Sequence, residues 1–76
     1  MSQPVDNLSS FYQERLRYLL QMQVQLERGE IAPPPGFTPR EAQSLTERAV
    51  LSTYRMLVSL GLEGEALRLI QAMRRQ

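Results

Sequence analysis

The chain has 76 residues, a net charge of +1, and neither cysteine nor histidine. This length allows one domain, and the composition excludes disulfides, zinc sites built from Cys and His, and catalysis by a histidine base. The small net charge argues against a broad basic surface for nucleic acid or an anionic membrane, and no apolar stretch reaches the roughly 20 residues of a membrane span.

A chain of this size buries only about 60% of the surface that its unfolded form exposes. Because no disulfide or Cys/His metal site can reinforce such a small core, we expect a second chain to complete it. The nine basic residues are all arginine, which reflects either a compositional bias or a preference for bidentate binding of carboxylates and phosphates. With lysine also missing, we expect no enzymatic activity, no metal and no cofactor.

Residues 1–6 are predicted to form a flexible tail. They lack the basic start and apolar run of a secretory signal, so we expect a cytoplasmic protein.

Residues 7–29 predict a first helix, because they contain no proline, are rich in good helix formers, and end at Gly29. The candidate N-caps are Asp6, Asn7, Ser9 and Ser10. The apolar residues recur every three or four positions, at Leu8, Phe11, Tyr12, Leu16, Leu19, Met22 and Leu26.

Two polar residues, Arg15 and Gln23, fall within this apolar stripe. In one interpretation, the aliphatic stem of Arg15 covers apolar surface while its charged head stays in water. In the other, both side chains reach across an interface and set the register of two paired helices, as polar residues do in coiled coils.

Residues 30–37 separate this helix from the next one. Their prolines, Pro33 to Pro35, and the following Gly36 favour an extended, stiff segment. A ligand for a proline-recognising domain would need a longer exposed motif with flanking specificity residues. We therefore interpret the segment as a rigid connector between two helices.

Residues 38–60 predict the second helix, and its start carries the clearest local signal in the sequence. Thr38 stands at the N-cap, Pro39 at the first helical position and Glu41 at the third, which together make a capping box. Phe37 precedes the cap, at the position of a hydrophobic staple.

This second helix is apolar over most of its circumference and ends at Gly61. Its polar residues fall on one narrow line: Glu41, Ser44, Arg48, Ser52, Arg55 and Ser59. Such a helix should be buried nearly all round, and one antiparallel neighbour cannot cover that much surface. We therefore expect four of its apolar residues to be covered by more than their own chain: Val50, Tyr54, Leu57 and Val58.

Residues 62–75 predict a short third helix, with acidic residues near its start and arginines at its end, an order that suits the helix dipole. Its apolar face consists of Leu62, Ala66, Leu69, Ile70 and Met73. The segment from Gly61 to Ile70 resembles the turn and second helix of a tetratricopeptide repeat, in which an alanine five residues after the glycine lets two helices approach closely. The resemblance implies close packing of the last two helices at Ala66, whereas a solenoid would need about three such units.

Together these elements predict an all-α fold, an antiparallel helical hairpin with a short third helix folded back on the second, completed by dimerisation. The favoured function is a non-enzymatic protein–protein interaction module, such as a small bacterial adaptor, secretion co-chaperone or anti-activator, bound to another protein or to itself through an apolar helical face. The residues predicted to bind the partner are Phe11, Tyr12, Arg15, Tyr18, Leu19, Met22, Leu26, Val50, Tyr54, Leu57 and Val58. For each aromatic or methionine side chain taken singly, an ordinary place in the core is the favoured interpretation.

Two other functions stay open at this point. A small dimeric DNA-binding regulator would use the third helix, where Arg68, Gln71, Arg74 and Arg75 are available. The nearly neutral charge speaks against nucleic acid as a partner. A purely structural subunit of a larger assembly would also suit a small helical chain with surplus apolar surface.

Overall fold

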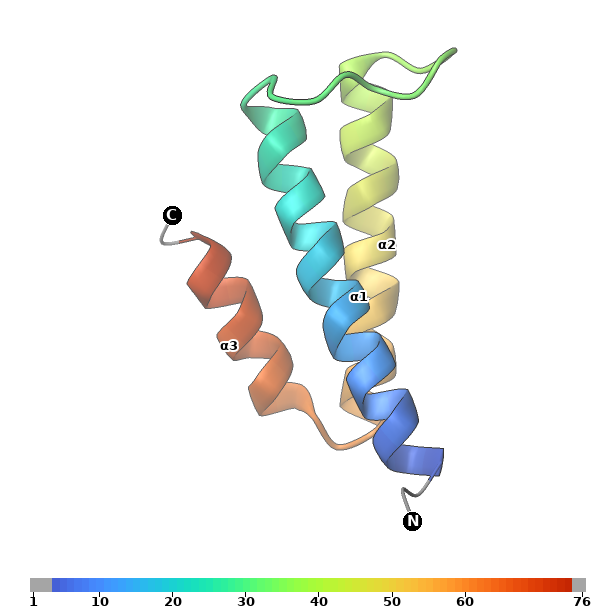
Figure 1. Ribbon diagram of the computed structural model, residues 1–76, viewed down its shortest axis with the longest axis vertical. Coiled ribbons are helices and arrows are strands. Elements are labelled where there is room, and N and C mark those ends of the chain that lie inside the picture. Colours follow the sequence, from blue (N-terminus) through green and yellow to red (C-terminus); the bar gives the residue numbers. More distant parts are fainter. Residues whose placement is uncertain (1–3, 75–76) are drawn as a thin grey trace.

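The computed structural model describes the backbone of residues 4–74 and the side chains of residues 7–74. Within that range the chain forms three helices and no strand, so the predicted all-α fold is confirmed: α1 (Pro4–Glu27), α2 (Pro39–Ser59) and α3 (Glu63–Arg74). α1 and α2 lie side by side and run in opposite directions, and α3 returns along them (Figure 1). The molecule is elongated, with extents of 43 × 27 × 19 Å.

α1 begins earlier than predicted, at Pro4 instead of Asn7. The first amides of a helix have no intrahelical acceptor, so a proline at this point loses no hydrogen bond, and its fixed φ already suits a helix. The prediction of a tail is therefore wrong for residues 4–6, and residues 1–3 lie outside the described part of the chain. The residues considered as N-caps all lie inside α1: Asp6, Asn7, Ser9 and Ser10.

Two glycines follow the ends of the first two helices. α1 ends at Glu27, two residues short of the prediction, and Gly29 follows it with φ at 70°. Gly61 follows α2 with φ at 79°, and the N–H of Leu62 then donates to the carbonyl of Leu57 at 2.8 Å. Glycine adopts this left-handed conformation without a steric cost, so each helix ends with its last carbonyls partly satisfied.

The start of α2 has the predicted capping box. The N–H of Glu41 donates to Oγ1 of Thr38 at 3.1 Å, and the N–H of Thr38 donates to Oε1 of Glu41 at 2.9 Å. Pro39 occupies the first turn, where no hydrogen bond is lost. Just before the cap, a turn with Gly36 at φ 88° brings the N–H of Phe37 to the carbonyl of Pro34 at 3.1 Å.

The core lies where the three helices meet. It consists of Leu16 and Leu20 from α1, Leu57 from α2 and Ala66 from α3. Leu16, Leu57 and Ala66 have no exposed surface. Ala66 thus allows a close approach, as the repeat resemblance implied, and it meets α1 as well as α2.

α2 presents small residues to α1. Ala42, Thr46 and Thr53 are buried, and the two threonine hydroxyls donate to carbonyls four residues earlier, at 2.8 Å to Ala42 and 2.7 Å to Ala49. Burial of these hydroxyls therefore leaves no polar group unpaired. The leucines of α1 pack against this line of small side chains.

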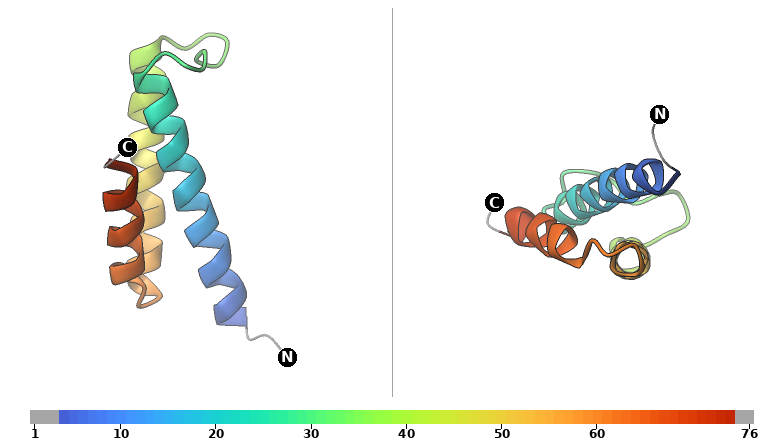
Figure 2. Two further views of the ribbon diagram at one scale, coloured as in Figure 1. Left: turned by 60° about the vertical axis from the view of Figure 1, so that its left-hand side comes forward. Right: turned by 90° about the horizontal axis from the view of Figure 1, so that it is seen from below.

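α3 packs more extensively against α1 than against α2, although α2 precedes it in the sequence (Figure 2). Leu69, Ile70 and Met73 of α3, and Leu62 just before its first residue, all pack against the shared core. The expected packing on the second helix is therefore only part of the arrangement, because the apolar face of α3 spans the seam between the other two helices. Arg75, the last residue of the predicted helix, lies outside the described residues.

Candidate functional site

One face of the α1–α2 pair, on the side away from α3, is apolar and uncovered. We call it the open face and define it by eight residues: Phe11, Arg15, Tyr18 and Met22 of α1 and Leu45, Ala49, Ser52 and Met56 of α2. In both helices the spacing is four, three and four, so each set forms a single stripe along one side of its helix. The core residues that meet α3 lie on other sides of these helices, and no α3 residue lines the hollows of the open face.

Large apolar side chains on this face are exposed to solvent. The exposed fraction is 56% for Phe11, 65% for Tyr18 and 47% for Leu45. Phe11 also contacts Tyr12 edge to face, with ring centroids 5.1 Å apart, so its ring is held above the surface and not folded into the core. Exposed apolar side chains that gather on one face in this way are a feature typical of interaction surfaces.

An apolar hollow of 310 Å³ lies at the connector end of the open face. We call it the connector hollow. Among its lining residues only Thr46 is polar, and the hydroxyl of Thr46 already donates to the carbonyl of Ala42. The hollow therefore suits an apolar side chain, because it offers a polar group no partner. Its walls are Leu19, Met22, Leu26, Ile31, Ala32, Pro34, Phe37, Ala42, Leu45, Thr46 and Ala49.

A second hollow of 330 Å³ continues the open face toward the N-terminal part of α1. Phe11, Arg15 and Met56 stand on its sides, and the small residues Ala49 and Ser52 are among those that line it. Ala49 lines both hollows. The open face is therefore hollowed at two places between the α1 stripe and the α2 stripe, and the small residues Ala49 and Ser52 stand midway along the α2 stripe.

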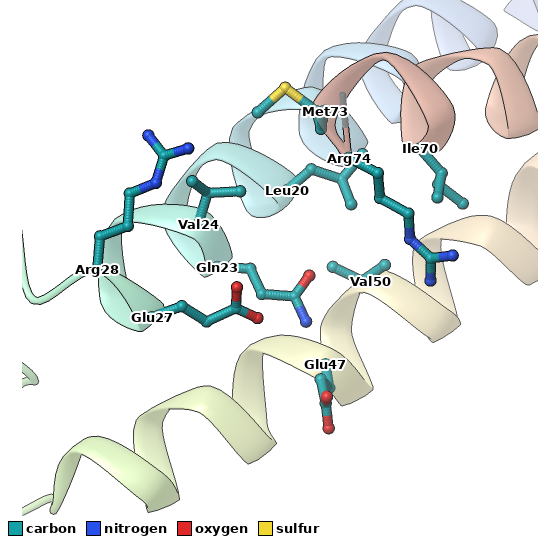
Figure 3. A pocket seen from close by; sticks show the side chains of 10 residues that line it. All are labelled: Leu20, Gln23, Val24, Glu27, Arg28, Glu47, Val50, Ile70, Met73 and Arg74. Atoms are coloured by element: carbon teal, nitrogen blue, oxygen red, sulfur yellow. The ribbon is translucent and has the colours of Figure 1, made fainter. Parts of the chain in front are cut away.

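A third hollow, of 530 Å³, lies on the other side of the molecule between α1, α2 and the last turn of α3 (Figure 3). Glu27 reaches toward α2, and Arg74 extends from α3 toward Val50. Carboxylates of Glu27 and Glu47 share its rim with arginines. This hollow is thus polar and of mixed charge, unlike the connector hollow.

Four of the residues predicted to bind a partner lie on the open face: Phe11, Arg15, Tyr18 and Met22. Tyr12 lines its second hollow and also packs against the core. Leu19 and Leu26 are buried in the chain, with only an edge on the connector hollow. Val58 is partly exposed, but its helical position places it on a different side of α2.

The expectation that α2 needs a second chain to cover Val50, Tyr54 and Leu57 is corrected by the structure. Leu57 has no exposed surface, and Val50 and Tyr54 pack against the core that α1 and α3 complete. The hydroxyl of Tyr54 also donates to Oε1 of Glu63 at 3.1 Å, which ties α2 to the first turn of α3. Burial by α3 and the hydrogen bond to Glu63 raise the pKa of Tyr54 above its ordinary value.

Part of the site was not predicted from the sequence. Leu45 belongs to the open face, and Ile31, Ala32 and Phe37 of the connector wall its hollow. The spacing of four, three and four in both helices is the signal that could have revealed the paired stripes. The connector was interpreted as a spacer, so Ile31 and Ala32 received no role, and Phe37 was expected only as a hydrophobic staple.

The charged groups of α3 do not form a continuous basic surface. Arg68 donates to Oε1 of Glu65 at 2.9 Å, as Arg17 donates to Glu14 of α1 at 3.2 Å. Among the described residues no cluster of acidic side chains could hold a metal ion. No helix of the described part is long and apolar enough to cross a membrane.

The open face is therefore a largely apolar, uncovered side of the α1–α2 pair. It combines two stripes of side chains, small residues midway along the α2 stripe and an apolar hollow at the connector end, and it contains no nucleophile paired with a base. Neither a protein-family model, nor a curated protein, nor a solved structure matches this chain.

Proposed function

We propose that this chain is a non-enzymatic protein–protein interaction module, of the adaptor, secretion co-chaperone or anti-activator type. In this proposal α1 and α2 act as a helical hairpin whose open face receives an apolar helical segment of a protein. The observation that carries it is the pair of matched stripes, which leaves Phe11, Tyr18 and Leu45 exposed together on one face.

The shape of the open face favours a helix as the bound element. The α1 stripe and the α2 stripe, with its small residues at the middle, form a groove. A groove of this kind holds an amphipathic helix through anchors spaced three and four residues apart. Ala49 and Ser52 allow such a helix to approach closely. A bound helix would turn the hairpin into a bundle, in which the stripes of α1 and α2 lie inside.

Position-specific photo-crosslinking tests this proposal. A photoreactive phenylalanine analogue replaces Tyr18 on the open face or, as a matched control, Leu51, which is 48% exposed on another side of α2. In cells that express the chain, we expect discrete protein crosslinks from position 18 and only background from position 51. Equal labelling from both positions would show that the open face is not a specific binding surface.

A further inference from the structure

We infer that the occupant of the open face is a second copy of this chain, which packs α1 against α1 in antiparallel fashion so that Phe11 of each copy enters the connector hollow of the other. The inference rests on the proposed function, since it takes the open face as the binding surface and names its partner. It also goes further, because it assigns a register and a two-fold symmetry.

The open face carries a protruding side chain, Phe11, and a hollow, the connector hollow, that fit each other in two copies of the chain. Phe11 projects near one end of the α1 stripe, and Met22, at the other end of that stripe, lines the connector hollow. A two-fold axis midway between these positions brings each Phe11 to the opposite hollow at the same time. Such an arrangement is isologous and closes as a dimer, without exposing a further copy of the same contact.

The residue spacing of the α1 stripe is the same from either end. Its spacing of four, three and four is symmetric about a point between Arg15 and Tyr18. The axis that pairs Phe11 with Met22 therefore also pairs Arg15 with Tyr18. The guanidinium of Arg15 then lies over the ring of the second Tyr18, a favourable cation–π geometry, while its stem covers apolar surface. This gives Arg15 the register role that polar residues have in helical pairs.

The single chain also exposes more surface than a compact monomer of the same mass. A folded monomer of 8.8 kDa is expected to expose about 4,800 Å², whereas this chain exposes 5673 Å². Its radius of gyration is 13.6 Å, against about 11.4 Å for a compact domain of this length. The excess surface is about 900 Å², close to the roughly 800 Å² that each partner buries in a stable interface.

Charge also permits self-association. The net charge of +1 gives two copies little mutual repulsion. Glu14 and Arg17, beside the α1 stripe, pair with each other within one chain and so present both signs at the edge of the interface. The Glu14–Arg17 pair then lies at the rim of the interface, Arg15 and Tyr18 of both copies lie nearest the two-fold axis, and the apolar contacts of Phe11 lie on either side of that axis.

Sedimentation equilibrium of the purified chain tests the inference, with one matched pair of variants. Leu45→Arg places a charge against the connector hollow, and Leu51→Arg places the same charge on an equally exposed leucine of α2 that lines neither hollow of the open face. We expect the wild type and Leu51→Arg to sediment as dimers. Leu45→Arg and Phe11→Ala should weaken dimerisation by about 30-fold or more, while far-ultraviolet circular dichroism shows that their helices are retained.

Disulfide trapping tests the register, because the chain contains no cysteine of its own. Phe11→Cys and Leu45→Cys chains are mixed, equilibrated and oxidised. We expect the mixed disulfide between positions 11 and 45 to dominate, and a Leu51→Cys chain to give none with Phe11→Cys. A dimer that links position 11 to position 11 would overturn the antiparallel register.

The outcomes separate this inference from the proposed function. If the wild type is a monomer at all concentrations, or if Leu45→Arg and Leu51→Arg affect dimerisation equally, the second copy is not the occupant. Crosslinks from position 18 to a different protein would then still support the interaction module. A monomer without specific crosslinks from position 18 would overturn both proposals.

Discussion

At the first turn of α2, Thr38 and Glu41 hold each other's backbone N–H groups. The hydrogen bond from the N–H of Thr38, and then the contact with its hydroxyl, lower the pKa of Glu41 below its ordinary value, against a small opposing effect of desolvation. Because the ionised carboxylate is the form that the folded state prefers, this cap contributes stability above the pKa of the unfolded chain. The contribution is lost as the pH falls through the lower folded value.

The lowered pKa of Glu41 predicts how the stability of a Glu41→Gln variant depends on pH. Glutamine can still accept from Thr38 but carries no charge, so we expect the variant to be less stable than the wild type near pH 6. The gap should narrow as the pH falls below the ordinary glutamate pKa and through the lower folded value, where Glu41 itself becomes neutral. Urea unfolding of both chains across this range measures the gap, and two parallel stability curves would contradict the expected pH dependence.

The hydroxyl of Thr38 can be tested separately. Thr38→Ala removes the acceptor for the N–H of Glu41, which then depends on water. Replacing a threonine N-cap by alanine costs about 1 kcal/mol, and we expect that loss in the free energy of unfolding at neutral pH. Thr38→Ser keeps the hydroxyl and serves as the control, with a stability close to that of the wild type.

Two leucines of α2 differ in what surrounds them. Leu57 has no exposed surface, and Leu51 is 48% exposed. Leu57→Ala should lower the free energy of unfolding by about 2–5 kcal/mol because it opens a cavity in the core shared by all three helices. Leu51→Ala should change it by less than about 0.5 kcal/mol. Chemical denaturation of both variants checks the contrast, and similar losses would show that the core is not centred on Leu57.

At the scale of elements, the contact between Tyr54 and Glu63 joins α2 to α3 across the Gly61 turn. Desolvation of the phenol, its hydrogen bond to Glu63 and the negative charge of that carboxylate all raise the pKa of Tyr54. A raised pKa means that the folded state favours the neutral phenol. The contact is therefore fully present below the ordinary tyrosine pKa of about 10 and is lost as the pH rises through the folded value.

The titration of this phenol can be isolated by difference. Subtracting the phenolate absorbance of a Tyr54→Phe variant from that of the wild type leaves the curve of Tyr54. Its midpoint should lie above about 10, and Glu63→Gln should move it downward, since the carboxylate charge is removed while desolvation remains. A midpoint that is unchanged by Glu63→Gln would show that the two side chains do not interact in solution.

The cap and the end of α2 could be predicted because they depend on neighbours in the sequence, whereas both ends of α1 differ from the prediction. Thr38 and Glu41 stand three residues apart, and Gly61 directly follows the last turn of α2. The partner of α3 could not be predicted in this way. Periodicity shows which side of α3 is apolar, but the side chains that cover it come from α1, whose register against α3 depends on packing across the whole chain.

At the scale of the whole molecule, the candidate site likewise depends partly on patterns within one helix and partly on how distant helices pack. The apolar circumference of α2 correctly indicated more apolar surface than one neighbour covers, and Leu45 and Met56 remain exposed. Which part of α2 stays open depended on where α3 lies. Leu57 is buried in the core that α1 and α3 complete, and Val50 and Tyr54 pack against that core. On α1 the outcome was better, because Phe11 and Tyr18 belong to the side that no other helix reaches.

If two copies form one folding unit, the stability of the molecule depends on its concentration. Unfolding then releases two chains, so a higher chain concentration favours the folded dimer and raises Tm. We expect the Tm of the wild type to rise by several degrees over a hundredfold range of concentration, as measured by circular dichroism. Leu51→Arg should show the same slope.

The change of Tm with chain concentration also distinguishes a dimer that stabilises the fold from a dimer of chains that are equally stable alone. Leu45→Arg should have a lower Tm than the wild type, and its Tm should not change with concentration, because its chains unfold singly. The core of Leu16, Leu57 and Ala66 is complete within one chain, so this variant still unfolds cooperatively. A wild-type Tm that is independent of concentration would show that the open face contributes nothing to stability through a second copy, and that the three-helix core alone holds the fold.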